Sequence, residues 1–176
     1  REGLRMGLLT NGTRIDAGRA AGLVAAGLRS VLLTLFSSDA SEHEEITILE
    51  GSFDKTLAAA RAFRSYGIPT NIRTPVMKPN RDCVPSLAAL CAREGFLFEP
   101  YFDLDPPRGC DTAPWALSPE EADEILVDHT EVFAPTFRRF GFAEAVVDAH
   151  GILHAGQCPV NPMGRVTKVD GTVIPL

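Results

Sequence analysis

The sequence is poor in cysteine, and its cysteines lack the spacing of a disulfide-rich or metal-binding domain. Its 176 residues contain four, Cys83, Cys91, Cys110 and Cys158, with no C-x-x-C pair. In a chain without a secretory signal, such cysteines are typical of free thiols in a reducing compartment, so we expect a cytoplasmic protein. Cys83 and Cys91 fall within an expected helix, where cysteine packs as a small apolar side chain.

Other absences exclude further classes. No apolar run approaches the roughly 20 residues of a membrane span, so we expect no membrane partner. The 17 Lys and Arg residues are scattered and the net charge is −6, which argues against a nucleic-acid surface. The G-x-G-x-x-G corner of a dinucleotide-binding fold is also missing. The first residue is Arg1 rather than Met, so we expect a segment of a longer protein.

Apolar runs alternate with helical patterns through the first two thirds of the chain. We expect strands at residues 4–10, 30–36, 68–76 and 96–102, and helices at 15–26, 53–66 and 84–94. Each expected helix is followed by a glycine (Gly27, Gly67 or Gly95), the residue that most readily terminates a helix. We expect a polar loop after the second strand, with His43 exposed at a helix start. The second helix should bury one face that contains Phe53, Leu57, Ala60 and Phe63.

This alternation predicts an α/β fold with parallel strands. Four strands cannot close an eight-stranded barrel, so residues 1–117 are predicted to form an open, partial (β/α) barrel. Residues 118–176 are predicted to form a separate extension. It begins with a helix from the Ser118 cap to about Thr130, continues through residues 142–150 as a strand or short helix, and ends in a β-hairpin around Asp170-Gly171.

The polar corners at the strand ends resemble those of the radical SAM superfamily, specifically its peptide-modifying branch with a SPASM or twitch extension. The resemblance rests on T-N-G-T at residues 10–13, TLFSSDASEHEEITILEGSF at 34–53, TPVMKPN at 74–80, and the spacing from Cys158 to Gly171. It implies an iron–sulfur oxidoreductase or maturase that cleaves S-adenosylmethionine to a 5′-deoxyadenosyl radical and modifies a peptide or small molecule. The implied cofactors are S-adenosylmethionine and a [4Fe–4S] cluster.

The resemblance also implies site residues at the carboxyl ends of the strands, where parallel barrels carry their chemistry. Thr34 takes the position of a family serine whose hydroxyl binds the cofactor. Thr10 and Asn11 would line the same mouth, and Tyr101 would stack on adenine. Lys78 would contact an anionic group of the substrate. Each has a structural alternative: Thr34 as a strand former, Asn11 as a turn residue, and Tyr101 as a core aromatic.

The sequence departs from the family pattern at several points. Phe36 and Ser37 replace the usual Asp and Gly, and Thr47 stands where many members have Arg. The C-x(3)-C-x(2)-C motif that holds the catalytic cluster is absent from the sequence. We therefore expect this chain alone to be inactive and to hold no bound cofactor. In a longer parent, the resemblance makes Cys158 a ligand of an auxiliary cluster.

Two other hypotheses remain open at this point. One is a cluster-free module of barrel-like fold that binds a peptide along an exposed sheet edge. The other is an unrelated (β/α) barrel lyase. The strand at residues 4–10 should have an unpaired apolar edge, so we expect either a homodimer or cover by the C-terminal segment.

Overall fold

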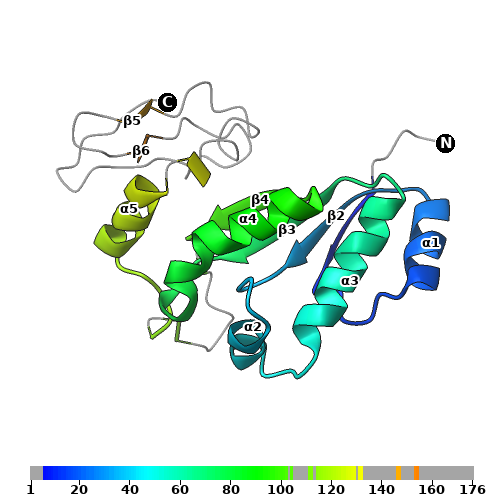
Figure 1. Ribbon diagram of the computed structural model, residues 1–176, viewed down its shortest axis with the longest axis horizontal. Helices are drawn as coiled ribbons and strands as arrows, with labels where there is room; N and C mark the ends of the chain where they lie inside the picture. The colour runs from blue at the N-terminus through cyan, green and yellow to red at the C-terminus, as the bar shows by residue number, and fades with distance from the viewer. Residues whose placement is uncertain are drawn as a thin grey trace. The chain divides into compact units, whose positions relative to one another are not determined.

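The computed structural model describes residues 6–102, 104, 111–112, 114–129, 131–132, 146–147 and 153–154. The chain divides into two compact units, Arg1–Tyr101 and Phe102–Leu176 (Figure 1). Each unit is described by itself below. The predicted boundary between residues 117 and 118 and the SPASM-like extension at 118–176 stay predictions.

The first unit contains one open parallel sheet, which confirms the predicted α/β fold. Its strands are β1 (Met6–Thr10), β2 (Leu28–Thr34), β3 (Thr70–Pro75) and β4 (Leu97–Tyr101), arranged in that order with all three pairings parallel. Because successive strands lie side by side, their carboxyl ends meet at one edge of the sheet.

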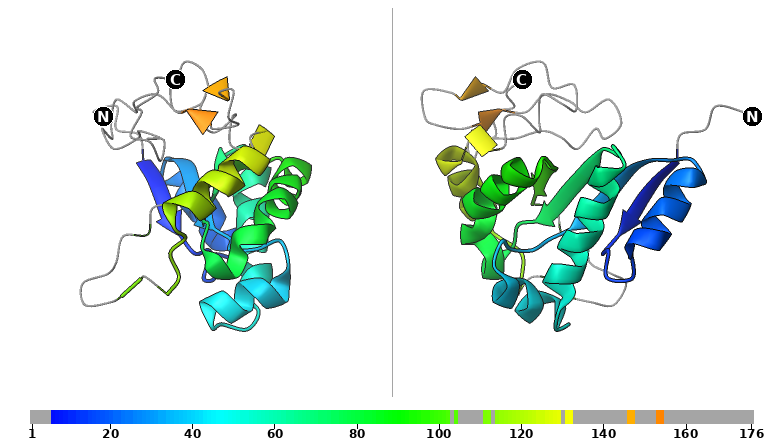
Figure 2. Two further views of the ribbon diagram at one scale, coloured as in Figure 1. Left: turned by 90° about the vertical axis from the view of Figure 1, so that its left-hand side faces the viewer. Right: turned by 45° about the vertical axis from the view of Figure 1, so that its right-hand side comes forward.

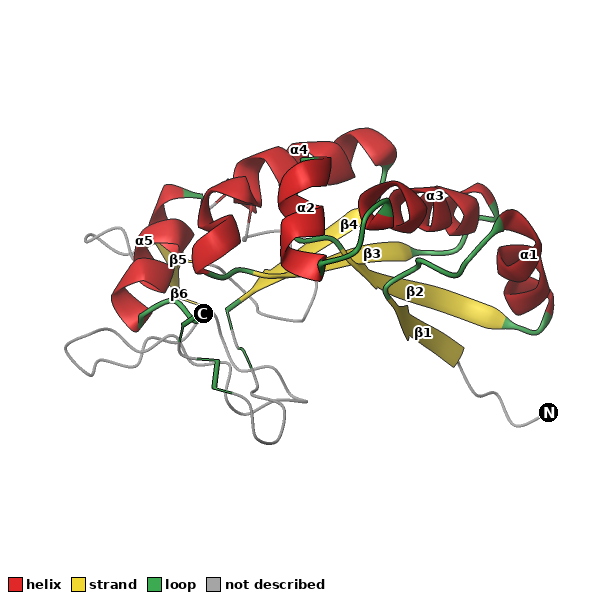
Figure 3. Ribbon diagram, turned by 90° about the horizontal axis from the view of Figure 1, so that it is seen from below, coloured by secondary structure: helices red, strands yellow, loops and turns green. Residues whose placement is uncertain are grey.

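Helices fill the connections between the strands. They are α1 (Ala17–Ala25), α2 (Ala40–Thr47), α3 (Ser52–Ser65), the 3-10 helix η1 (Lys78–Cys83) and α4 (Val84–Glu94). Figures 1 and 3 show α1, α3 and α4 on the same face of the sheet. The three predicted stop glycines all have positive φ, at 102° for Gly27, 69° for Gly67 and 70° for Gly95. Each helix therefore ends where glycine can turn the chain.

The core lies between the sheet and these helices. Leu33 of β2, Ile72 of β3 and Phe63 of α3 are each 0% exposed. The expected face of α3 is confirmed, because Phe53, Leu57, Ala60 and Phe63 are all buried. Cys83 and Cys91 are also buried, as expected, and burial raises the pKa of each thiol to about 12.

The expectation of a polar loop after β2 was wrong, since residues 40–47 form α2. Asp39 caps this helix: its Oδ1 accepts hydrogen bonds from the backbone N–H groups of Ser41 and Glu42 at 2.9 and 3.1 Å. The prediction that His43 is exposed was also wrong. Its side chain is buried, because α2 turns it toward Phe36 and Phe53.

In the second unit, α5 spans Pro119–Asp128. The predicted capping box is confirmed: Glu121 N–H donates to Ser118 Oγ at 3.2 Å, and Ser118 N–H donates to Glu121 Oε2 at 2.7 Å. Two short strands, β5 (Val146–Val147) and β6 (Leu153–His154), pair antiparallel. The predicted hairpin at 165–174 and Cys158 lie outside the described residues.

At one edge of the first sheet, β1 has a described partner only on its β2 side (Figure 2). Leu9 of this strand is 74% exposed, so the edge carries the apolar surface that the sequence predicted. Whether a second copy or another segment covers it stays a prediction. Among the described helices, none combines the length and the apolar character needed to cross a membrane.

Candidate functional site

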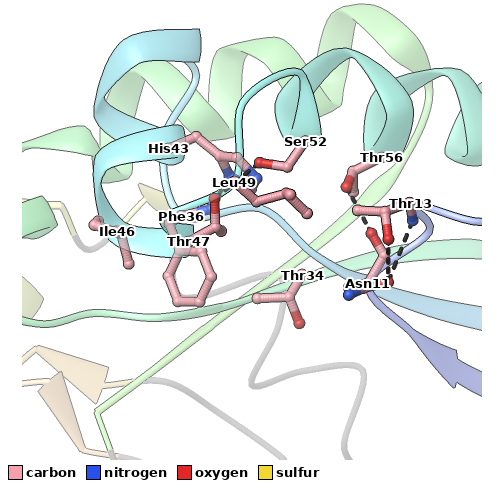
Figure 4. A pocket seen from close by; sticks show the side chains of 10 residues that line it. All are labelled: Asn11, Thr13, Thr34, Phe36, His43, Ile46, Thr47, Leu49, Ser52 and Thr56. Atoms are coloured by element: carbon pink, nitrogen blue, oxygen red, sulfur yellow. Dashed lines mark hydrogen bonds between the residues drawn. The ribbon is translucent and has the colours of Figure 1, made fainter.

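A cavity of about 360 Å³ opens at the carboxyl ends of β1 and β2, beside α2 and the start of α3 (Figure 4). Its volume falls within the usual range for small-molecule sites. Its lining is Asn11, Thr13, Thr34, Phe36, His43, Ile46, Thr47, Leu49, Ser52 and Thr56. The cavity thus combines hydroxyl and amide groups with apolar side chains, and no Lys or Arg of the described residues lines it.

The corner after β1 is held by a network of short-range hydrogen bonds. Asn11 Oδ1 accepts from Thr13 N–H at 3.2 Å and from Thr13 Oγ1 at 3.0 Å. Thr56 Oγ1 of α3 donates to the Asn11 carbonyl at 2.6 Å. Gly12 has φ of 76°, and a Cβ there would lie 2.8 Å from a methyl group of Leu33. Glycine is therefore required at this corner, which presents Asn11 to the cavity.

His43 forms part of the opposite wall. Its Nδ1 accepts a hydrogen bond from the Phe36 backbone N–H at 3.1 Å, and its ring lies 5.7 Å from the Phe53 ring between centroids. Burial lowers the pKa of this imidazole, and the nearby Glu44 charge opposes the shift only partly. The ring is therefore neutral near pH 7. Because Nδ1 accepts, the proton lies on Nε2.

Two hydroxyl groups close the cavity where α2 meets α3. Thr47 Oγ1 and Ser52 Oγ lie 2.8 Å apart and share a hydrogen bond. The turn between them places Ile48 in the left-handed region with φ of 53°, which is uncommon for a β-branched residue. This turn brings the end of α2 back to the start of α3, so both hydroxyls face the same cavity (Figure 4).

The sequence matches one known protein family over more than half of its length. The family described as the radical SAM superfamily matches residues 1–91, more than half of the chain. The chain belongs to the radical SAM superfamily. The open parallel sheet and the cavity at its strand ends therefore belong to a radical SAM fold.

Two curated relatives share the name AdoMet-dependent heme synthase. The protein from Methanosarcina barkeri is 29% identical over 124 residues, which cover 70% of this chain and 35% of the relative. The protein from Nitratidesulfovibrio vulgaris is 27% identical over 126 residues, covering 71% of this chain and 34% of the relative. This radical SAM chain thus spans about a third of the length of these two relatives.

Solved structures share the fold. Native anSMEcpe with bound AdoMet and the Kp18Cys peptide superposes with a TM-score of 0.63 at 23% identity, over 98% of this chain and 51% of that one. Native anSMEcpe with bound AdoMet alone gives a TM-score of 0.61 at 21% identity, over 98% and 50% of the two chains. At these identities the similarity establishes the partial-barrel fold of radical SAM proteins.

The structure brings two of the predicted radical SAM site residues together. Asn11 and Thr34 both line the cavity, from the ends of β1 and β2. Thr10, Lys78 and Tyr101 do not line it. Thr10 Oγ1 instead accepts from Gly12 N–H at 3.1 Å, and Lys78 is exposed in the first turn of η1.

Tyr101 has a contact that the sequence did not indicate. The guanidinium carbon of Arg73 lies 4.3 Å from the centroid of its ring. The sequence also missed His43, Thr47, Ser52 and Thr56 as lining residues. One sequence signal could have revealed α2, which carries His43 and Thr47. Asp39 is followed three positions later by Glu42, a pattern typical of a helix start.

The described residues do not fit an iron–sulfur cluster. No group of three or more His, Cys, Asp or Glu side chains within the described part of the chain is placed to hold a metal ion. Cys83 and Cys91 are buried free thiols, and neither belongs to such a group.

Proposed function

We propose that this chain is the part of a radical SAM enzyme that binds AdoMet in the cavity lined by Asn11 and Thr34. The observation that carries the proposal is their convergence. Family resemblance assigned both residues to cofactor contact from separate motifs, and both line one cavity at adjacent strand ends. Cavities at the carboxyl ends of parallel strands are the usual ligand sites of such folds.

The lining groups fit the neutral polar parts of AdoMet. The Thr34 hydroxyl and the Asn11 amide can each donate and accept hydrogen bonds, as ribose hydroxyls require. Neutral His43, packed between Phe36 and Phe53, keeps a positive charge away from a sulfonium ligand. When bound with its reducing cluster, AdoMet supplies the radical chemistry, and the protein supplies orientation and exclusion of water.

The names of the curated relatives support a haem precursor as the substrate of the whole enzyme. The alternative is a peptide, which the spacing from Cys158 to Gly171 favours by its resemblance to a SPASM domain. We rank the haem precursor first, since the two relatives resemble this chain in sequence over most of its length. The proposed setting is the cytoplasm.

The chain by itself is proposed to be inactive in AdoMet cleavage. Its sequence has no C-x(3)-C-x(2)-C motif, and the two described cysteines are not grouped with other possible metal ligands among the described residues. Cofactor binding and cofactor cleavage are therefore separable, and binding can be measured on this chain without a cluster.

Calorimetric titration with S-adenosylhomocysteine, the neutral thioether that lacks the sulfonium methyl group of AdoMet, tests the proposal. We expect saturable binding that Thr34→Val weakens by about tenfold, because one hydrogen bond to the ligand is lost. Thr70→Val is the matched control: it is also a strand threonine, but its hydroxyl donates to the Ile68 carbonyl at 3.0 Å, outside the cavity. Equal affinities for all three proteins would contradict the proposal.

A further inference from the structure

The sheet face opposite the helices carries a polar cluster that the cofactor proposal does not use. Side chains alternate between the two faces of a strand. Ile72 and Thr74 are 0% exposed and Phe98 packs against the core, so their neighbours project from the other face. Figure 3 shows none of the helices of residues 6–102 on that face. The cluster comprises Asn71 and Arg73 of β3 and Glu99 and Tyr101 of β4.

Strand register places this cluster beside the cavity. Thr34 of β2 pairs with Arg73 of β3, and Arg73 pairs with Glu99 of β4. Adjacent strands lie about 4.8 Å apart, so these three residues form one row across the sheet. Thr34 also lines the cavity. A molecule that contacts Arg73 would therefore lie next to a ligand in the cavity.

Glu99 and Tyr101 fix the position of Arg73 but leave its hydrogen-bonding capacity available. Arg73 Nε lies 3.4 Å from Glu99 Oε1, close enough for an ion pair, yet it is not aligned for a hydrogen bond. Tyr101 supports the guanidinium through its ring face. Glu99 Oε2 is occupied by Asn71 Nδ2 at 2.6 Å. The Arg73 side chain is still 41% exposed, against 14% for Glu99.

A second observation points to a ligand. Asn71 is only 6% exposed, and its Oδ1 has no hydrogen-bond partner among the described residues. Buried polar atoms are rarely left unpaired in folded proteins. Asn71 Oδ1 is an acceptor, so it would bind a donor group or a water molecule, whereas Arg73, whose Nε has no hydrogen-bond partner among the described residues, carries the donors on this face that suit an anion.

We propose that Arg73, held by Glu99 and Tyr101, is the anchor for a carboxylate group of the substrate. A guanidinium presents paired N–H donors in the geometry of a carboxylate, and its delocalised charge is weakly hydrated. The inference rests on the proposed function, since it identifies the substrate class for the same strand-end site. A haem precursor with propionate groups belongs to that class.

The test uses protoporphyrin IX, which has two propionates, and its dimethyl ester, which has none free. Each is titrated into the chain and followed by porphyrin absorbance in the same detergent solution. We expect the wild-type chain to bind the acid at least about tenfold more tightly than the ester. Arg73→Gln should weaken acid binding by about tenfold and remove the preference for acid over ester.

Arg61→Gln is the matched control. It removes the same charge and also breaks an Arg–Glu pair, since Arg61 contacts Glu94 at 2.6 and 2.8 Å on the helical side. We expect it to keep the wild-type preference. Arg73→Lys keeps the charge but not the planar donor pair, so its preference for acid over ester should be intermediate. This variant replaces Arg73→Gln in the test if Arg73→Gln does not fold.

Three results would overturn the inference: no porphyrin binding to the wild-type chain, equal binding of acid and ester, or an unchanged preference in both Arg73 variants. Binding of S-adenosylhomocysteine to the wild-type chain separates this failure from failure of the proposed function. If that ligand binds while porphyrin selectivity is absent, only the carboxylate anchor is wrong. If neither ligand binds, both proposals fail.

Discussion

The two faces of the four-stranded sheet differ in what their side chains do, although they alternate along the same strands. The face toward α1, α3 and α4 carries Leu33 and Ile72, both fully buried among apolar neighbours. One residue away along each strand, the opposite face carries Thr34 and Arg73. The packed core and the proposed ligand contacts thus fall on alternate residues of the same strands, so substitutions on the two faces should have separable effects.

The largest difference is expected between neighbouring leucines of β2. Leu33→Ala removes a fully buried side chain from the helical face and should lower the free energy of unfolding by about 2–5 kcal/mol. Leu32→Ala, on the opposite and partly exposed face, should cost about 1 kcal/mol. Urea denaturation followed by circular dichroism measures both. Equal losses would show that the two faces are packed alike.

A smaller contrast is expected between two glutamates. Glu99→Gln weakens the ion pair with Arg73 on a largely buried side chain and should cost about 2 kcal/mol. Glu94→Gln weakens the pair with Arg61; these side chains are 17% and 55% exposed and make two short contacts, so the cost should be about 1 kcal/mol. Added salt should reduce the stability loss of Glu94→Gln more than that of Glu99→Gln, because Arg61 is more exposed than Arg73. A larger loss at Glu94 would contradict the distinction.

Two glycines on the helical side should respond with opposite sign. Gly95 ends α4 with φ of 70°, so Gly95→Ala should destabilise the fold by about 1 kcal/mol. Gly22 lies within α1 with open space around it, so Gly22→Ala should stabilise by up to about 1 kcal/mol. Thermal unfolding of both variants gives the signs directly. The same sign for both would refute the backbone argument.

The smallest effect concerns the cavity wall. Burial lowers the pKa of His43 below the ordinary value of 6.5, so the unfolded chain takes up a proton at a higher pH than the folded chain does. The contribution of His43 to the free energy of unfolding is therefore fully present above pH 6.5. It is lost as the pH falls below that value, because the unfolded chain then binds the proton more readily. In urea unfolding between pH 7.5 and 5.5, His43→Asn should show a shallower loss than wild type. Parallel pH profiles would mean that the His43 ring is accessible to water.

Much of the helical layer could be predicted from the sequence, because long apolar runs and stop glycines depend on local chemistry. The helix at 84–94 was predicted with its observed bounds. Helix α2 was missed, since its residues ASEHEEIT offer little apolar periodicity and its one buried residue is a histidine. That burial depends on Phe36 and Phe53, which only tertiary packing brings together.

The candidate site was predictable in part for a similar reason. Asn11 and Thr34 follow directly from strand ends, which the sequence located. The Arg73–Glu99 contact depends on the register between β3 and β4, and a shift of one residue would move Arg73 to the other face. Register is set by the packed sheet as a whole, so the cluster on the open face could not be found from local patterns.

The central claim is that the cavity at the ends of β1 and β2 receives the cofactor, and amide NMR of the isotopically labelled chain tests it most directly. On titration with S-adenosylhomocysteine, we expect the largest shifts at Gly12, Thr34, His43 and Ser52, which lie in or beside the cavity wall. Amides at the far ends of the strands, such as Leu28 and Leu97, should stay unchanged. Shifts confined to those distant amides, or no shifts at saturating ligand, would contradict the account.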